Sequence, residues 1–254
     1  MEQREPITPD DARAGKPHLE LRQFSRVEIP FNTALLKRGL DVLISGAGLA
    51  VLSPFLLLVA VLIKMDSPGP VFYTQIRIGQ ERRWRTRRRE PLDVRVDLRK
   101  GERRNIMSPG RLFRIHKFRT MVRNAEDLTG PTWASPHDPR VTRVGGVLRL
   151  LRVDELPQLW NVFKGEMSLV GPRPERPHFV KKFADKIPEY TARLRVRPGI
   201  TGLAQVSTLD EITEEEIHKK LDLDLRYLRD LRLVSDLKIL LKTLVVLARK
   251  MTRA

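Results

Sequence analysis

The stretch VLISGAGLAVLSPFLLLVAVLI, residues 42–63, decides how this chain is organised. Its 22 residues carry no charge. A straight helix of that length measures roughly 33 Å, and the hydrocarbon core of a bilayer is about 30 Å thick. A buried helix of a soluble domain is the alternative, but such helices rarely contain so long an uncharged run. The stretch therefore predicts a membrane-embedded helix within residues 32–66.

The dipeptide Ser53-Pro54 lies in the middle of this helix. Proline lacks a backbone donor and clashes with the preceding turn, so we expect a bend there, with the Ser53 hydroxyl as a partner for the freed carbonyl. Lys37 and Arg38 precede the apolar run and Lys64 follows it. Positive residues favour the cytoplasmic side. These flanks favour a re-entrant helix that enters and leaves by one face, and a kinked spanning helix is the alternative.

The segments on either side differ in character. Residues 1–31 are polar and proline-containing, which predicts a flexible tail and excludes a signal peptide. Residues 71–79 and 112–118 alternate apolar and polar positions, which predicts a β-hairpin, with the arginine-rich residues 81–110 as a basic insertion at its tip. The remainder of the cytosolic part, 67–254, is predicted mostly helical. The fold class is therefore α+β, with an N-terminal re-entrant membrane helix.

The charge balance indicates an anionic partner. The chain has 48 Lys and Arg against 31 Asp and Glu, a formal charge of +17. Residues 82–104 contribute 11 basic and four acidic residues, or +7, so the excess is partly local. A uniformly basic nucleic-acid-binding domain is disfavoured, and membrane lipids or phosphorylated substrates fit better. The absence of cysteine excludes disulfides, zinc thiolate sites and a cysteine nucleophile.

The acid pair Asp154-Glu155 is the sharpest candidate for chemistry. Asp154 suits the N-cap of a helix over residues 156–163, in which Pro157 is tolerated in the first turn. Acidic residues commonly cap helices, so the position of the pair alone says little about whether it is catalytic. Two adjacent carboxylates can nevertheless divide the roles of nucleophile or base and of metal ligand. A helix start with arginines nearby should also keep Asp154 ionised.

Several cationic side chains are candidates for phosphate binding. Arg149 precedes the acid pair, and Lys117 and Arg119 stand at the end of the second predicted strand. Alone, each would be read as a solvated charge. Pro172 and Pro174 stiffen the backbone around Arg173, and a loop with a low ordering cost suits nucleotide binding. A rigid connector is the alternative interpretation of this loop.

The last predicted helix, residues 233–248, carries apolar side chains at helical spacing. They are found at positions 237, 240, 241, 244, 245 and 248. A helix that packs on the core is one interpretation, and a helix on the membrane surface is the other.

Several sequence blocks in order resemble the bacterial sugar transferase family, the monotopic polyprenyl-phosphate phosphoglycosyl transferases. The resemblance runs from about residue 36 to about residue 247. The blocks include KRGLDVLIS (37–45), FRIHKFRTM (113–121), VDELPQLWNVFKGEMSLVGPRPE (153–175) and RVRPGITGLAQV (195–206). Together they are far more specific than any single motif.

This resemblance implies an enzyme at the cytoplasmic face of the bacterial inner membrane that uses Mg²⁺. Asp154 would attack the β-phosphorus of a UDP-sugar, release UMP and hold the phosphosugar until polyprenyl (undecaprenyl) phosphate accepts it. Glu155 would bind the metal, Arg149 and Lys117 would meet phosphates, and residues 172–174 would contact uridine. Such a reaction is the first membrane step of exopolysaccharide, O-antigen or glycoconjugate synthesis.

Three features depart from the family pattern. Arg152 stands where a serine is usual, two residues before the acid pair. The segment 81–110 is longer and more basic than the usual turn. The chain lacks the additional spans of larger members, which suggests a minimal catalytic form. A catalytically degenerate membrane scaffold for polysaccharide assembly is the alternative function, and a homodimer is left open.

Overall fold

The computed structural model describes residues 30–81, 110–123, 125, 138–207 and 213–252. Apart from their outermost residues, the predicted tail (1–31) and basic insertion (81–110) lie outside this part of the chain. In chain order, the elements are α2 (Phe31–Asp66), β1 (Phe72–Ile78), β2 (Leu112–Phe118), α3 (Arg143–Leu150), the 3-10 helix η3 (Val153–Glu155), α4 (Gln158–Lys164), β3 (Ser168–Val170), α5 (Pro177–Lys186), the 3-10 helix η4 (Pro188–Arg195), β4 (Gly199–Thr201), α6 (Glu214–Arg229) and α7 (Leu233–Met251). Helices and two small sheets together confirm the predicted α+β class.

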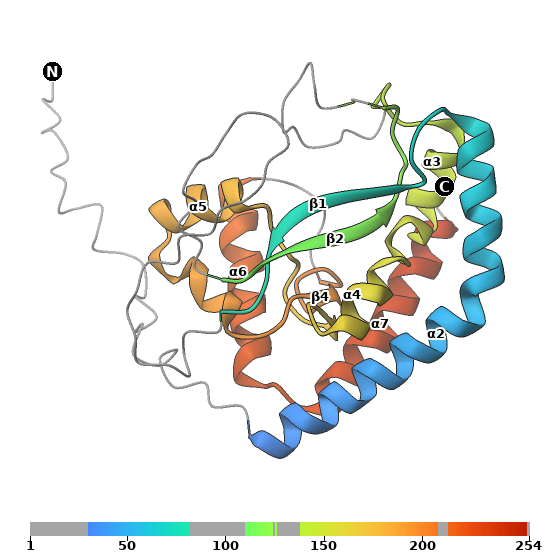
Figure 1. The fold of residues 1–254 in the computed structure, drawn as a ribbon. Helices are drawn as coiled ribbons and strands as arrows, with labels where there is room; N and C mark the ends of the chain where they lie inside the picture. Colours follow the sequence, from blue (N-terminus) through green and yellow to red (C-terminus); the bar gives the residue numbers. More distant parts are fainter. Residues whose placement is uncertain (1–29, 82–109, 124, 126–137, 208–212, 253–254) are drawn as a thin grey trace, which may run out of the picture.

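Helix α2 runs along the edge of the molecule and bends near its middle (Figure 1). It is the one helix in the described part of the chain that is long and apolar enough to cross a membrane, and only 11 % of its most apolar stretch is buried. Pro54 leaves the carbonyl of Ala50 without its helical donor, because that donor would be the missing N–H of residue 54. The Ser53 hydroxyl donates to this same carbonyl over 2.8 Å. The partner predicted for the freed carbonyl is confirmed.

Strands β1 and β2 form the predicted antiparallel hairpin (Figure 1). Their register runs from Phe72 opposite Phe118 to Ile78 opposite Leu112. The rings of Phe72 and Phe118 stack at 5.5 Å, at the end of the hairpin where Lys117 emerges. Apolar residues of β1 and β2 that face inward belong to three of the hydrophobic clusters, so the hairpin links α2 to the rest of the domain.

A second, unpredicted sheet joins β3 and β4 in parallel, with Ser168 opposite Gly199 and Val170 opposite Thr201. The chain segments that follow approach each other closely. A Cβ atom at Gly171 or Gly199 would collide with the main chain of the other segment. Glycine at both positions therefore allows the loop after β3 to lie directly against β4.

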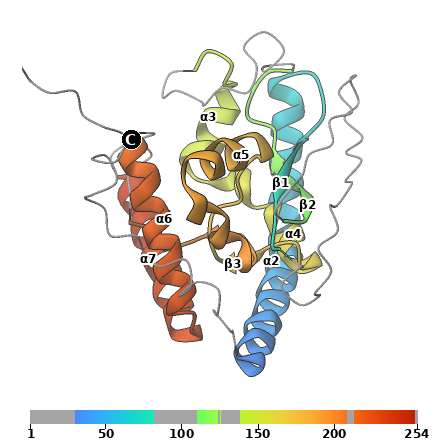
Figure 2. The same ribbon diagram turned by 90° about the vertical axis from the view of Figure 1, so that its left-hand side faces the viewer.

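The hydrophobic core consists of several adjoining clusters between α2 and the C-terminal helices (Figure 2). Val59 and Ile63 of α2 pack with Phe118 of β2 and Leu148 of α3. This contact fixes the second half of α2 beside the hairpin. Further clusters connect β1 with α5, η4 and α6, and β3 with α6 and α7.

Helix α7 packs on the core through a face that includes Leu240 of the predicted apolar stripe but not the stripe's leucines at 237, 241 and 244. Ile239 is buried, and Leu240 packs against the same cluster. Leu237, Leu241 and Leu244 of the predicted stripe are 58 %, 57 % and 64 % exposed. The helix is thus apolar on two sides, one facing the core and one facing outward.

Candidate active site

The acid pair lies in the short 3-10 helix η3, between α3 and α4. The prediction that Asp154 caps a helix is wrong, because α4 begins only at Gln158 and Pro157 occupies its N-cap position. Arg152 precedes η3 with a left-handed φ of 56°, an uncommon conformation for a residue with a side chain. This turn ends α3 and places both carboxylates on the inner side of the protein, where each residue is 8 % exposed.

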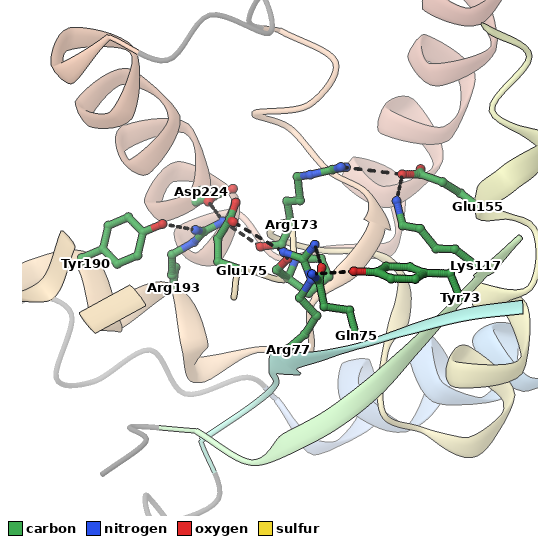
Figure 3. Close-up of polar contacts among 11 residues, drawn as sticks. Tyr73, Gln75, Arg77, Lys117, Glu155, Arg173, Glu175, Tyr190, Arg193 and Asp224 are labelled. Atoms are coloured by element: carbon green, nitrogen blue, oxygen red, sulfur yellow. Dashed lines mark hydrogen bonds and ion pairs between the residues drawn. The ribbon is translucent and has the colours of Figure 1, made fainter. Parts of the chain in front are cut away.

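Cationic side chains from separate elements surround the pair. The Lys117 ammonium of β2 lies 2.7 Å from Glu155 Oε1 and 4.0 Å from Asp154 Oδ2. The guanidinium groups of Arg152 and Arg173 lie 3.6 Å and 3.7 Å from Glu155 Oε1. Figure 3 shows Arg173 reaching the Glu155 carboxylate from one side and Lys117 from below. Residues far apart in sequence therefore gather positive charge around two buried carboxylates.

The two carboxylates differ in their pKa. Burial alone would raise the pKa of Glu155, but Lys117, Arg173 and Arg152 lower it to about 2. For Asp154, burial raises the pKa above its ordinary value, and Lys117 offsets this only in part. The nearby cations lower the pKa of Asp154, as predicted, but the burial that raises this pKa was not visible in the sequence. Glu155 is thus the firmly ionised member of the pair and Asp154 the more basic one.

Of the other predicted phosphate ligands, Arg149 lies near the pair and Arg119 does not. Arg149 donates through Nε to the Thr120 hydroxyl over 2.8 Å and lowers the pKa of Asp154. Arg119 donates instead to Ser67 O at 2.6 Å and to Pro68 O at 2.9 Å, behind the end of α2. The reason is that β2 ends at Phe118, so Arg119 no longer points in the direction that strand alternation gives Lys117. Its predicted role in phosphate binding is corrected to holding the turn after α2.

Arg173 and Pro174 of the predicted nucleotide loop and Glu155 of the acid pair line one small pocket. Two polar residues of this pocket, Arg77 and Gln158, were not predicted from the sequence. Strand alternation was an available signal for Arg77, because it places Arg77 on the same face of β1 as Tyr73 and Gln75. The pocket is lined by Arg77, Ile115, Lys117, Glu155, Gln158, Arg173, Pro174, Gly199 and Ile200. The structure thus brings Arg173 and Pro174 of the nucleotide-loop candidates together with Glu155 of the acid pair.

A buried carboxylate at the start of α2 was also missed. Asp41 is 2 % exposed and its Oδ1 accepts from Leu169 N at 2.9 Å and from the Ser168 hydroxyl at 3.1 Å. Lys37, one turn earlier, donates to Val170 O and pairs with Asp236 of α7. A lone acid beside a long uncharged run was the available signal. These contacts hold α2 against β3, the strand that leads into the loop.

Comparison with known proteins places these features in a family. The family described as Bacterial sugar transferase matches residues 32–87 and 99–250, which include α2, the acid pair and the pocket. This chain belongs to the bacterial sugar transferase family. The gap between the two matched stretches, residues 88–98, lies inside the segment predicted as a basic insertion.

Relatives with descriptive names share the same region. The chain is 42 % identical over 211 residues to the UDP-N-acetylgalactosamine-undecaprenyl-phosphate N-acetylgalactosaminephosphotransferase of Aeromonas hydrophila, covering 83 % of this chain and 43 % of that protein. It is 39 % identical over 215 residues to the undecaprenyl-phosphate glucose phosphotransferase of Komagataeibacter xylinus, covering 83 % and 35 %. The exopolysaccharide production protein PSS of Rhizobium leguminosarum is 36 % identical over 219 residues, covering 83 % and 94 %. The chain thus spans less than half of the first two relatives and most of the third.

Proposed function

We propose that this protein transfers a sugar 1-phosphate from a UDP-sugar to polyprenyl (undecaprenyl) phosphate and releases UMP. The observation that carries the proposal is the buried acid pair with Lys117, Arg152 and Arg173 directed at it. All reacting partners are anions, and preformed cations in a partly desolvated site stabilise the charge that moves between them. The names of the relatives point to the same reaction class.

The reaction proceeds in two displacements. A carboxylate oxygen of Asp154 bonds to the sugar-bearing β-phosphorus while the anhydride P–O bond breaks and UMP leaves with the electron pair. An oxygen of polyprenyl phosphate then attacks this phosphorus, the acyl phosphate bond breaks, and the Asp154 carboxylate is regenerated. The product is polyprenyl-diphosphate-sugar. A covalent intermediate divides one difficult exchange into two easier ones.

The different pKa values support this division of labour. Asp154 has the raised pKa and the weaker ion pairing, so its carboxylate is the more basic nucleophile. Glu155 stays charged and receives three cationic groups on one oxygen. An intact pair of this kind favours an active enzyme over a degenerate scaffold.

Glu155 is the residue to hold Mg²⁺. Among the described residues, no group of three His, Asp or Glu side chains could enclose a metal alone. Mg²⁺ suits such a site, because it commonly uses one or two carboxylates and completes its shell with water and substrate phosphates. When bound, the ion would neutralise diphosphate charge.

The bent helix is proposed to be re-entrant, with the domain at the cytoplasmic face of the inner membrane. Near its start, Lys37 and Asp41 contact β3. Behind its end, Arg119 binds the turn formed by Ser67 and Pro68. Both ends therefore contact one compact domain, which supports their lying on the same side of the bilayer, and the exposed apolar middle would contact lipids.

The catalytic proposal is tested with Asp154→Asn, assayed in lipid nanodiscs for UMP release from a panel of UDP-sugars with undecaprenyl phosphate. We expect release to fall by about 10⁴-fold or more, since the nucleophile is lost. Asp222→Asn, on the exposed side of α6, is the matched control. Full activity of Asp154→Asn, or failure to trap a phosphosugar on Asp154 by mass spectrometry during turnover, would refute this mechanism.

The topology is tested with single cysteines at Ser25 and Ser207, because the chain has no native cysteine. In intact cells, both should be shielded from a membrane-impermeant thiol reagent. Labelling of one position alone would show that α2 spans the bilayer.

A further inference from the structure

Four successive carbonyls of the loop after β3 each accept a hydrogen bond, and the donors belong to β1, η4 and β4. Pro172 O accepts from Gly199 N at 2.9 Å, and Glu175 O accepts from Ile78 N at 3.1 Å. Between them, Arg173 O accepts from Arg193 Nη2 at 3.0 Å, and Pro174 O accepts from Arg77 Nη1 at 3.2 Å. The loop is therefore held along its length through its main chain.

The two central bonds come from arginine side chains because the loop cannot make a regular strand ladder. Pro172 and Pro174 have no N–H to contribute to such a ladder. Their fixed φ angles stiffen the loop, but its carbonyls still need donors. Arg77 reaches it from β1 and Arg193 from η4, so the hairpin and the C-terminal half of the domain both hold it.

Arg193 is itself held in a buried network (Figure 3). Its Nη2 lies 2.7 Å from Asp224 Oδ2 of α6, and its Nη1 donates to the Tyr190 hydroxyl at 2.7 Å. The side chains of Arg193 and Asp224 are only 8 % and 3 % exposed. A buried ion pair is weak evidence for stability, because desolvation offsets most of its attraction. The ion pair with Asp224 instead orients the Arg193 guanidinium so that it donates to the carbonyl of Arg173.

The consequence reaches the acid pair. The main chain of Arg173 is bound by Arg193, while its own guanidinium lies 3.7 Å from Glu155 Oε1. A displacement of this backbone would move the guanidinium with it and would distort the pocket wall formed with Pro174. Sub-ångström placement of such groups matters strongly in a catalytic site.

We infer that Arg193, held by Asp224 and Tyr190, is a positioning residue that fixes the Pro172-Arg173-Pro174 loop for the uridine nucleotide. The inference rests on the proposed function and adds a residue that lies outside the pocket. Arg193 acts only through the loop. Because the uridine leaves with UMP before polyprenyl phosphate reacts, the contact of this loop with uridine serves the half-reaction in which the UDP-sugar binds.

Steady-state kinetics can separate the two half-reactions, because kcat/KM for each substrate of a two-displacement enzyme reports its own half. The test variant is Arg193→Lys, which keeps the charge facing Asp224 but lacks the planar fork needed to reach Arg173 O as well. We expect kcat/KM for the UDP-sugar to fall by about 10- to 100-fold. For undecaprenyl phosphate it should change by less than about twofold. Arg226→Lys is the matched control. Arg226 pairs with Asp222 on the outer side of α6, the helix that also carries Asp224, and this substitution should change neither kcat/KM value.

Hydrogen exchange supplies the structural measurement. The amide of Gly199, which donates to Pro172 O, should exchange faster in Arg193→Lys than in the native protein, while the β1–β2 amides keep their protection. Equal losses in both kcat/KM values, or native kinetics in a variant with native exchange, would overturn the inference. If the native protein releases no UMP, the proposed function fails first. In that case the affinity of UMP for the native protein and for Arg193→Lys, measured by calorimetry, decides the inference. Equal affinities would refute it.

Discussion

The loop 171–175 is bound at nearly every carbonyl, whereas the polar contacts of α2 with other elements, among the described residues, lie near its two ends. Asp41 and Asp66 mark those ends, accepting from Leu169 N and Val144 N. The difference follows from the surroundings that each segment would meet. A loop that binds a polar nucleotide needs fixed dipoles along its length. A helix middle in lipid must instead satisfy its polar groups internally, as Ser53 does for Ala50.

The largest effect should come from the acid pair, where the loop meets the hairpin. Lys117→Met removes the cation shared by both carboxylates, and we expect kcat to fall by about 10²- to 10³-fold. Because Lys117 lowers the pKa of Asp154, its loss raises that pKa further. The active form is the ionised carboxylate, so the acidic limb of the pH–rate profile should move to higher pH. Lys117→Arg, which retains a charge, should show a smaller shift, and an unmoved limb in Lys117→Met would contradict the assignment.

At the start of α2, Asp41→Leu should destabilise the protein without removing any catalytic group. The Leu169 N–H and the Ser168 hydroxyl would lose their acceptor in a buried place, at a cost of about 2–3 kcal/mol. Thermal unfolding in nanodiscs measures the change. Asp222→Leu, at an exposed position, is the control. Unchanged stability of Asp41→Leu would show that the end of α2 is not fastened as described.

In the middle of α2, Ser53→Ala tests the internal hydrogen bond to Ala50. Removing the hydroxyl leaves this carbonyl without the donor that replaces the proline N–H. We expect a loss of about 1 kcal/mol in stability. Ser207→Ala, measured by the same unfolding assay, provides the comparison. A neutral result would indicate that water or lipid headgroups satisfy the carbonyl.

The smallest effect should come from Arg152→Asn. Asparagine tolerates the left-handed backbone at this position, so the substitution removes charge while preserving the turn. Arg152 is one of several cations near the pair and its side chain is 34 % exposed, so solvent screens it. We expect kcat to change by less than about threefold at physiological salt. A loss comparable to that of Lys117→Met would mean that this family departure carries a catalytic role.

Local patterns made the larger elements predictable. The uncharged run with its Ser53-Pro54 interruption predicted α2 and its bend, because helix length and proline geometry depend on neighbouring residues. Alternation predicted the hairpin for the same reason. The helix start at Asp154 was predicted wrongly, since the left-handed turn at Arg152 delays α4 to Gln158. The prediction that Arg119 binds phosphate was also wrong. The contacts of Arg119 depend on where β2 ends and on which segment lies behind that strand end.

Contiguous residues were enough to predict the long apolar helix α2, the α+β class, the acid pair and the candidate loop. Only the tertiary structure decided which carboxylate is firmly ionised and what holds the loop. Both depend on groups distant in sequence, such as Arg77 and Pro174, which are 97 positions apart. Burial and Coulomb interactions act through space, and a linear pattern does not contain those distances.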